Sequence, residues 1–83
     1  MSDENRPRLR RIHSDETLES GASRFSLAYW RRQETQQIIE SLSQGNDEAL
    51  QVKTDGRIFN GNVRVKVLEE RGFDINVLKR EVI

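Results

Sequence analysis

The 83-residue chain has no cysteine, which excludes disulfide bonds, thiolate nucleophiles and cysteine-ligated metal sites together. Its one histidine, His13, lies in a polar stretch, so neither a histidine metal site nor a histidine general base is expected. No apolar run approaches the length of a membrane span, and the N-terminus is charged where a signal peptide needs an apolar segment. We therefore expect a cytoplasmic protein with no membrane partner, no metal and no cofactor.

The chain also has no excess of charge of either sign. Fourteen basic residues balance fourteen acidic ones, so the whole molecule offers no general attraction to nucleic acid or to an anionic membrane. Any such binding must depend on a local group of residues. Apolar and charged residues each make up 34% of the chain, which suits one small domain with additional polar sequence.

Residues 1–24 contain few apolar positions among many Ser, Asp, Glu and Arg residues. Such a segment buries too little apolar surface to offset the entropy of ordering it, so we predict a disordered tail. The basic cluster at residues 6–11 is followed by acidic residues and is interpreted as solvated sequence rather than as a nucleic-acid arm. The predicted folded domain covers residues 25–83. The scattered apolar positions of the tail after Met1 are Leu9, Ile12, Leu18 and Ala22.

The rest of the chain predicts a small α/β (α+β) domain with a short mixed sheet. Asp55-Gly56 is a turn dipeptide that joins two strands as a hairpin, and Gly61 and Gly72 are placed to begin and end a helix. Ser26, Thr35 and Asp74 are candidate helix caps. Helices are predicted near residues 27–32, 36–44 and 62–71, and strands at 50–53, 57–59 and 80–83. The predicted core includes Trp30, Ile38, Ile39, Leu42, Leu50, Val52, Ile58, Val67 and Leu68.

Arg64 is the most informative charged residue. On a helix over residues 62–71, successive side chains turn by about 100°, which places Arg64 near the middle of an apolar arc and Lys66 on the other side. An unpaired buried charge is costly, so Arg64 must either pair with a carboxylate or open into a pocket where it can meet a ligand. A glycine before a helix also leaves free N–H groups at its start, which favours an anion.

An aromatic group lies near the start of the predicted domain. Phe25, Tyr29 and Trp30 are next to Arg24, Arg31 and Arg32, an arrangement that can stack on nucleobases. With only five aromatic residues in the chain, we assign these rings first to the core and keep stacking as the alternative.

Residues 35–83 resemble the ParB/sulfiredoxin-like superfamily, in particular small stand-alone bacterial ParB-like proteins. The resemblance rests on the 35–44 helix, the strand–Asp55-Gly56–strand unit, the step Gly61-Asn62-Val63-Arg64 and the ending Glu69-Glu70-Arg71-Gly72. It implies a phosphate site at Gly61, Asn62 and Arg64. Partition-type ParB domains have Gly-Glu-Arg-Arg at this step, so this chain lacks the acidic residue and one arginine. Sulfiredoxins have Gly-Cys-His-Arg, and without cysteine their sulfinic acid reduction is excluded.

The first functional hypothesis is a non-catalytic ParB-like module that binds phosphate, nucleotide or nucleic-acid backbone through Gly61, Asn62, Arg64 and Lys66. The second is a protein-interaction or regulatory adaptor in which Arg64 is structural. A third, weaker hypothesis is a metal-dependent nuclease that uses loop carboxylates. These carboxylates are Asp47, Glu48 and Asp55, and their spacing indicates no metal site. The identity of the partner and the oligomeric state are left open.

Overall fold

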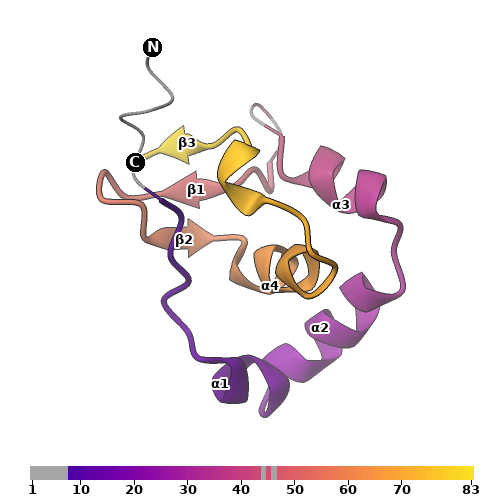
Figure 1. The fold of residues 1–83 in the computed structure, drawn as a ribbon. Coiled ribbons are helices and arrows are strands. Elements are labelled where there is room, and N and C mark those ends of the chain that lie inside the picture. Colours follow the sequence, from indigo (N-terminus) through magenta and orange to yellow (C-terminus); the bar gives the residue numbers. More distant parts are fainter. Residues whose placement is uncertain (1–7, 44, 46) are drawn as a thin grey trace.

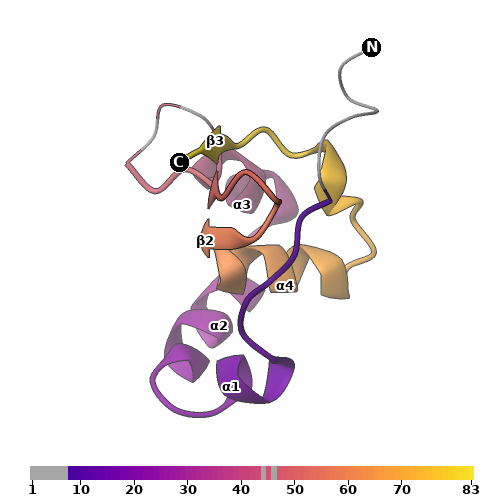
Figure 2. The same ribbon diagram turned by 90° about the vertical axis from the view of Figure 1, so that its left-hand side faces the viewer.

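The computed structural model describes residues 8–43, 45 and 47–83. They form an α+β domain with a three-stranded mixed sheet, as predicted (Figure 1). Helix α4 lies between the sheet and the pair α1 and α2 (Figures 1 and 2). Within the described ranges, no helix has the length and apolar character of a membrane span. The elements are α1 (Asp15–Glu19), α2 (Ser23–Arg31), α3 (Thr35–Ser41), β1 (Gln51–Val52), β2 (Ile58–Asn60), α4 (Asn62–Glu70), the 3₁₀ helix η2 (Ile75–Val77) and β3 (Glu81–Val82).

The sheet is built on the predicted hairpin. The N–H of Lys53 donates to the carbonyl of Arg57 at 2.8 Å, and the N–H of Gly56 donates back to Lys53 at 2.9 Å, which closes the turn. β1 pairs antiparallel with β2 and parallel with β3, giving the strand order β2-β1-β3. The C-terminal strand thus lies beside the hairpin, as the sequence predicted.

Helix α4 is bounded by the two glycines that the sequence singled out. Gly61 precedes it with φ +117°, and Gly72 follows it with φ +81°. At the C-terminal end, Phe73 N–H donates to Leu68 and Gly72 N–H to Glu69, both at 3.0 Å, which is a Schellman motif. Both ends are therefore fixed by backbone conformations that favour glycine.

α2 and α3 are separate helices, as predicted, although their caps differ from those expected. α2 begins at Ser23, so Ser26 lies inside it, and α3 is preceded by Glu34, whose N–H donates to Gln37 Oε1 at 3.3 Å. Arg71 holds the break between the helices. Its Nη2 donates to the carbonyls of Arg31 (3.1 Å) and Gln33 (2.8 Å), and its Nη1 donates to Thr35 Oγ1 (2.9 Å). This guanidinium satisfies carbonyls that the end of α2 leaves without partners.

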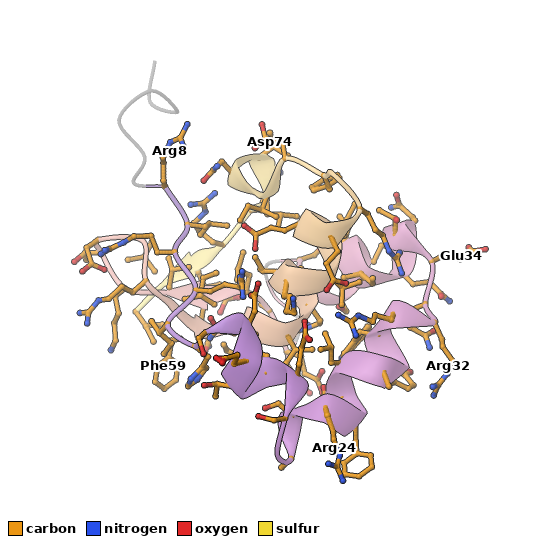
Figure 3. All side chains as sticks on the ribbon, turned by 60° about the horizontal axis from the view of Figure 1, so that its bottom comes forward. Arg8, Arg24, Arg32, Glu34, Phe59 and Asp74 are labelled. Atoms are coloured by element: carbon orange, nitrogen blue, oxygen red, sulfur yellow. The ribbon has the colours of Figure 1, made fainter. Side chains whose placement is uncertain are left out.

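The core occupies the space between α4, the sheet and the other helices. Most of the predicted core side chains are buried there, while Trp30 and Ile39 are partly buried and pack against it. Val65 and Leu27 are also buried. The side chains labelled in Figure 3, among them Asp74, lie at the periphery of the domain.

The N-terminal part of the structure differs from the predicted disorder. Residues 8–24 pack on the domain, whereas residues 1–7 of the predicted tail lie outside the described residues. Arg10 pairs with the hairpin: its N–H donates to Gly56 O at 2.9 Å, and its carbonyl accepts from Ile58 N–H at 2.8 Å. Leu9 and Leu18 are buried. The prediction failed because it counted apolar residues, whereas the segment is also held by hydrogen bonds and ion pairs with distant residues.

Candidate functional site

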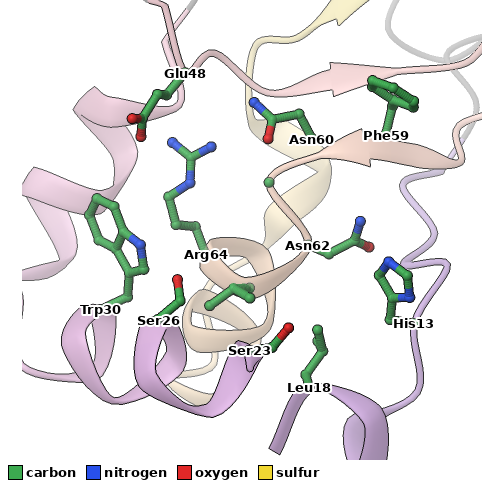
Figure 4. Close-up of a pocket in the computed structure, with 12 residues that line it drawn as sticks. His13, Leu18, Ser23, Ser26, Trp30, Glu48, Phe59, Asn60, Asn62 and Arg64 are labelled. Atoms are coloured by element: carbon green, nitrogen blue, oxygen red, sulfur yellow. The ribbon is translucent and has the colours of Figure 1, made fainter. Parts of the chain in front are cut away.

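A cavity of about 320 Å³ opens beside the first turn of α4. Side chains from α2 form one wall, and the end of β2 and the start of α4 form another (Figure 4). In Figure 4 the Arg64 guanidinium points toward Glu48, which comes from the segment before β1. The lining includes Ser26, Trp30, Asn60 and Asn62. The walls are therefore largely polar around one cation.

Arg64 is only 5% exposed, yet its hydrogen bonding is incomplete. Its Nη1 donates to the carbonyl and to the Oγ of Ser41, both at 3.1 Å, and its guanidinium lies 5.6 Å from the centre of the Trp30 ring. Within residues 8–43, 45 and 47–83, nothing accepts a hydrogen bond from Nε or Nη2, and no carboxylate lies within salt-bridge distance. The guanidinium is thus held at one nitrogen and keeps donors for another group.

Two opposing effects act on the charge of this guanidinium. Burial lowers the pKa of Arg64, and the negative charge of Glu48 offsets part of that shift. An arginine nevertheless stays protonated in proteins, so the cavity keeps its positive charge. Glu48 itself is exposed. It acts on Arg64 through space rather than as a partner in a close ion pair.

Gly61 brings the backbone close to the core at the cavity wall. A Cβ at this position would lie 3.0 Å from Cδ1 of Leu50 and 3.2 Å from Cδ2 of Leu42, so a side chain does not fit without movement. The following N–H groups, in the first turn of α4, have no partners within the helix. They add the positive end of the helix dipole to the charge of Arg64.

Asn62 lines the cavity, but its side chain serves the fold. Oδ1 accepts from the N–H of Ile12 at 3.0 Å, and Nδ2 donates to the carbonyl of Ile58 at 3.0 Å. The side chain is buried and ties the N-terminal segment to β2. Of the polar groups of Asn62, its backbone N–H is therefore the one left for a ligand.

Lys66 lies apart from the cavity, in agreement with its predicted position on the other side of α4. It is 4% exposed, and its ammonium lies 3.0 Å from Glu70, 3.1 Å from Glu19 and 3.6 Å from Asp15. Burial acts to lower the pKa of Lys66, but hydrogen bonds to Glu70 and Glu19, together with the negative charges of Glu70 and Asp15, outweigh it and raise the pKa. The lysine anchors α1 to α4, so the structure does not bring it together with Gly61 and Arg64.

Sequence reasoning missed the two residues that contact the Arg64 guanidinium. Ser41 orients Arg64, but it comes from α3, and its position depends on how α3 packs on α4. Trp30 was assigned to the core, and predicting that it lies close to Arg64 would have required knowledge of the angle between α2 and α4. No local pattern could have revealed either contact.

The loop carboxylates of the nuclease hypothesis do not gather at this cavity. Asp55 pairs with Arg57 at 2.9 Å and with Arg10 at 3.5 Å in the hairpin turn, whereas Glu48 lines the cavity. In the described part of the chain, no three His, Asp or Glu side chains are grouped as metal ligands would be. The arrangement is suited to holding an anion. Comparison of the chain with protein-family models, curated proteins and solved structures found no match.

Proposed function

We propose that this protein binds a phosphate group, carried by a nucleotide or by a nucleic-acid backbone, in the cavity at the start of α4. The observation that carries the proposal is Arg64, a buried guanidinium with no carboxylate partner among the described residues and with Nε and Nη2 left without acceptors. The role is binding rather than catalysis. The proposal also places the protein in the cytoplasm, where phosphate esters are abundant.

Preorganisation supports the proposal. Ser41 fixes Nη1, so Arg64 loses little side-chain freedom when a ligand arrives, and hydrogen bonds to charged groups contribute about 1.5–3 kcal/mol each. The first-turn N–H groups that follow Gly61 supply further donors to the same space. The resemblance to ParB/sulfiredoxin-like proteins predicts phosphate binding at this same step of the sequence.

Phosphate titration tests the proposal. Adding inorganic phosphate, then pyrophosphate, to ¹⁵N-labelled protein should shift the amide signals of residues 61–65. Arg64→Lys should weaken this binding about tenfold, because an ammonium cannot reproduce the fixed fork of the guanidinium. The matched control is Arg57→Lys, which changes an exposed arginine of the hairpin turn and should leave the affinity unchanged. The proposal fails if residues 61–65 do not shift, or if Arg64→Lys binds as tightly as the wild type.

A second candidate function is that of a protein-interaction or regulatory adaptor in which Arg64 is structural. The hydrogen bonds from Arg64 to Ser41 and the nearby negative charge of Glu48 favour this candidate. Glu48→Gln separates the two. If the cavity binds phosphate, the variant should bind it about threefold or more tightly, because a nearby negative charge has been removed. If Arg64 is structural, the variant should instead lose unfolding free energy while phosphate has no effect on the amide signals.

A further inference from the structure

The outer face of α2 carries an exposed stripe of rings and guanidinium groups. Phe25 is 68% exposed and Tyr29 49% exposed, and they are one helical turn apart. Arg24 and Arg32 flank them along the helix and project to the periphery of the domain (Figure 3). We call these four residues the α2 stripe. Two large rings on one exposed helix face are not explained by core packing.

The two arginines of the stripe are available for a ligand. Neither forms an ion pair with any carboxylate in the described part of the chain, whereas the neighbouring Arg31 pairs with Glu70 and Glu19. The Arg24 guanidinium lies over the Phe25 ring, 4.8 Å from its centre. The stripe therefore combines unpaired positive charge with flat aromatic surface, although the whole chain has no net charge.

The Tyr29 side of the stripe lies next to residues that line the cavity beside Arg64. At about 100° per residue, Tyr29 lies only about 60° around the helix from Ser26, which lines the cavity. The Tyr29 ring meets the Trp30 ring edge-on at 5.1 Å, and the Trp30 ring lies 5.6 Å from the Arg64 guanidinium. The Tyr29 and Trp30 rings thus connect the stripe to the Arg64 guanidinium.

We infer that the ligand is a single-stranded nucleic acid, whose bases stack on Phe25 and Tyr29 while its phosphates contact Arg24, Arg32 and the cavity of Arg64. This inference rests on the proposed function, because Arg64 supplies the innermost phosphate contact. A single strand exposes its base faces to aromatic side chains, whereas a duplex hides them in its stack. An acidic protein would use the arginines but would leave the flat faces of the rings without a matching partner.

Fluorescence anisotropy with a labelled twelve-residue oligothymidylate, repeated with oligouridylate, tests the inference. Phe25→Ala and Tyr29→Ala should each weaken binding about fivefold or more, since one base–aromatic stack contributes that much. The matched control Val82→Ala removes an exposed apolar side chain from β3 and should have no effect. All these side chains are exposed, so thermal unfolding followed by circular dichroism should show every variant folded.

Salt dependence gives a second measurement. Three phosphate contacts predict a slope of log affinity against log salt of about −2, and Arg24→Gln with Arg32→Gln should reduce its magnitude by about 1.4. The charge-matched control Arg8→Gln with Lys79→Gln changes two exposed residues outside the stripe and should leave the slope unchanged.

Three results would overturn the inference: unchanged affinity in both ring variants, equal binding of a duplex, or displacement of the oligonucleotide by polyglutamate at equal charge concentration. If phosphate shifts residues 61–65 but the oligonucleotide does not bind, this inference is wrong and the proposed function stands. If phosphate itself produces no shift, the proposed function has failed and the inference fails with it.

Discussion

Replacing Gly61 with alanine tests how closely the backbone approaches the core at the cavity. The substitution adds one methyl group, which would lie 3.0 Å from Leu50 Cδ1 and 3.2 Å from Leu42 Cδ2. Both leucines are fully buried and have little room to move. The residue also has φ +117°, a conformation that side chains with a Cβ rarely adopt.

The expected loss of stability has two parts. The left-handed backbone costs alanine about 1–2 kcal/mol, and overpacking the leucines costs about a further 1–3 kcal/mol. The matched control is Gly72→Ala, which has φ +81° but, apart from its two chain neighbours, no atom of the described residues within 4 Å of the new methyl group, so it should show the backbone cost alone. The difference between the variants therefore contains the steric contribution together with the difference between the two backbone angles. A domain of this length has an unfolding free energy of about 4–12 kcal/mol, so both variants should be measurable.

Urea unfolding followed by Trp30 fluorescence measures both values. We expect Gly61→Ala to lose about 2–5 kcal/mol and Gly72→Ala about 1–2 kcal/mol. Equal losses would refute the steric argument, because Gly61→Ala should add overpacking against Leu50 and Leu42 to a backbone cost at least as large as that of Gly72→Ala. A change in the slope of unfolding free energy against urea concentration in one variant would indicate an altered unfolded or native state. The stabilities of the two variants would then have to be compared by hydrogen exchange.

Two further predictions concern the polar contacts of α4. A hydrogen bond from Arg31 and a further one from Lys66 hold the pKa of Glu70 at about 2, below its ordinary value of 4.5, despite the opposing effect of burial. Because the folded-state pKa of Glu70 is depressed, the stabilisation by its carboxylate is complete above about pH 4.5 and is lost as the pH falls towards 2. In urea unfolding, the difference in stability between the wild type and Glu70→Gln should therefore shrink over this pH window. A constant difference would contradict the prediction. Asn62→Ala should cost about 1–3 kcal/mol and accelerate amide exchange at Ile12, because that N–H loses its acceptor; unchanged exchange would count against the assigned contact.

The sequence predicted the parts of the fold that depend on local conformation. Asp55-Gly56 predicted the hairpin, and Gly61 and Gly72 predicted the limits of α4, because each position needs a backbone shape that few residues adopt. Arg64 could be identified for a related reason. Its place on an apolar arc follows from helical geometry, which predicted that Arg64 either pairs with a carboxylate or opens into a pocket. The structure places it beside a cavity, the second of these outcomes.

The rest depends on contacts between distant parts of the chain. Lys66 was grouped with the phosphate site, but its ammonium lies beside Glu70, one turn later on α4, and beside Asp15 and Glu19, which the packing of α1 brings to it. The side chain of Asn62 likewise accepts a hydrogen bond from the N–H of Ile12, 50 residues earlier in the chain. A residue's chemistry indicates what it can bind, and only the tertiary structure determines which partner it meets.

The docking of residues 8–12 has a consequence for how the protein folds. The acceptor for Leu9 N–H is Asn76, 67 residues later in the chain, and the acceptor for Ile12 N–H is Asn62. During synthesis, residues 8–12 leave the ribosome well before these partners exist, so their docking is complete only after α4 and η2 have been made. Closing such long loops slows folding relative to a domain with local contacts. We therefore expect the last folding event to be the return of residues 8–12 to an already assembled sheet.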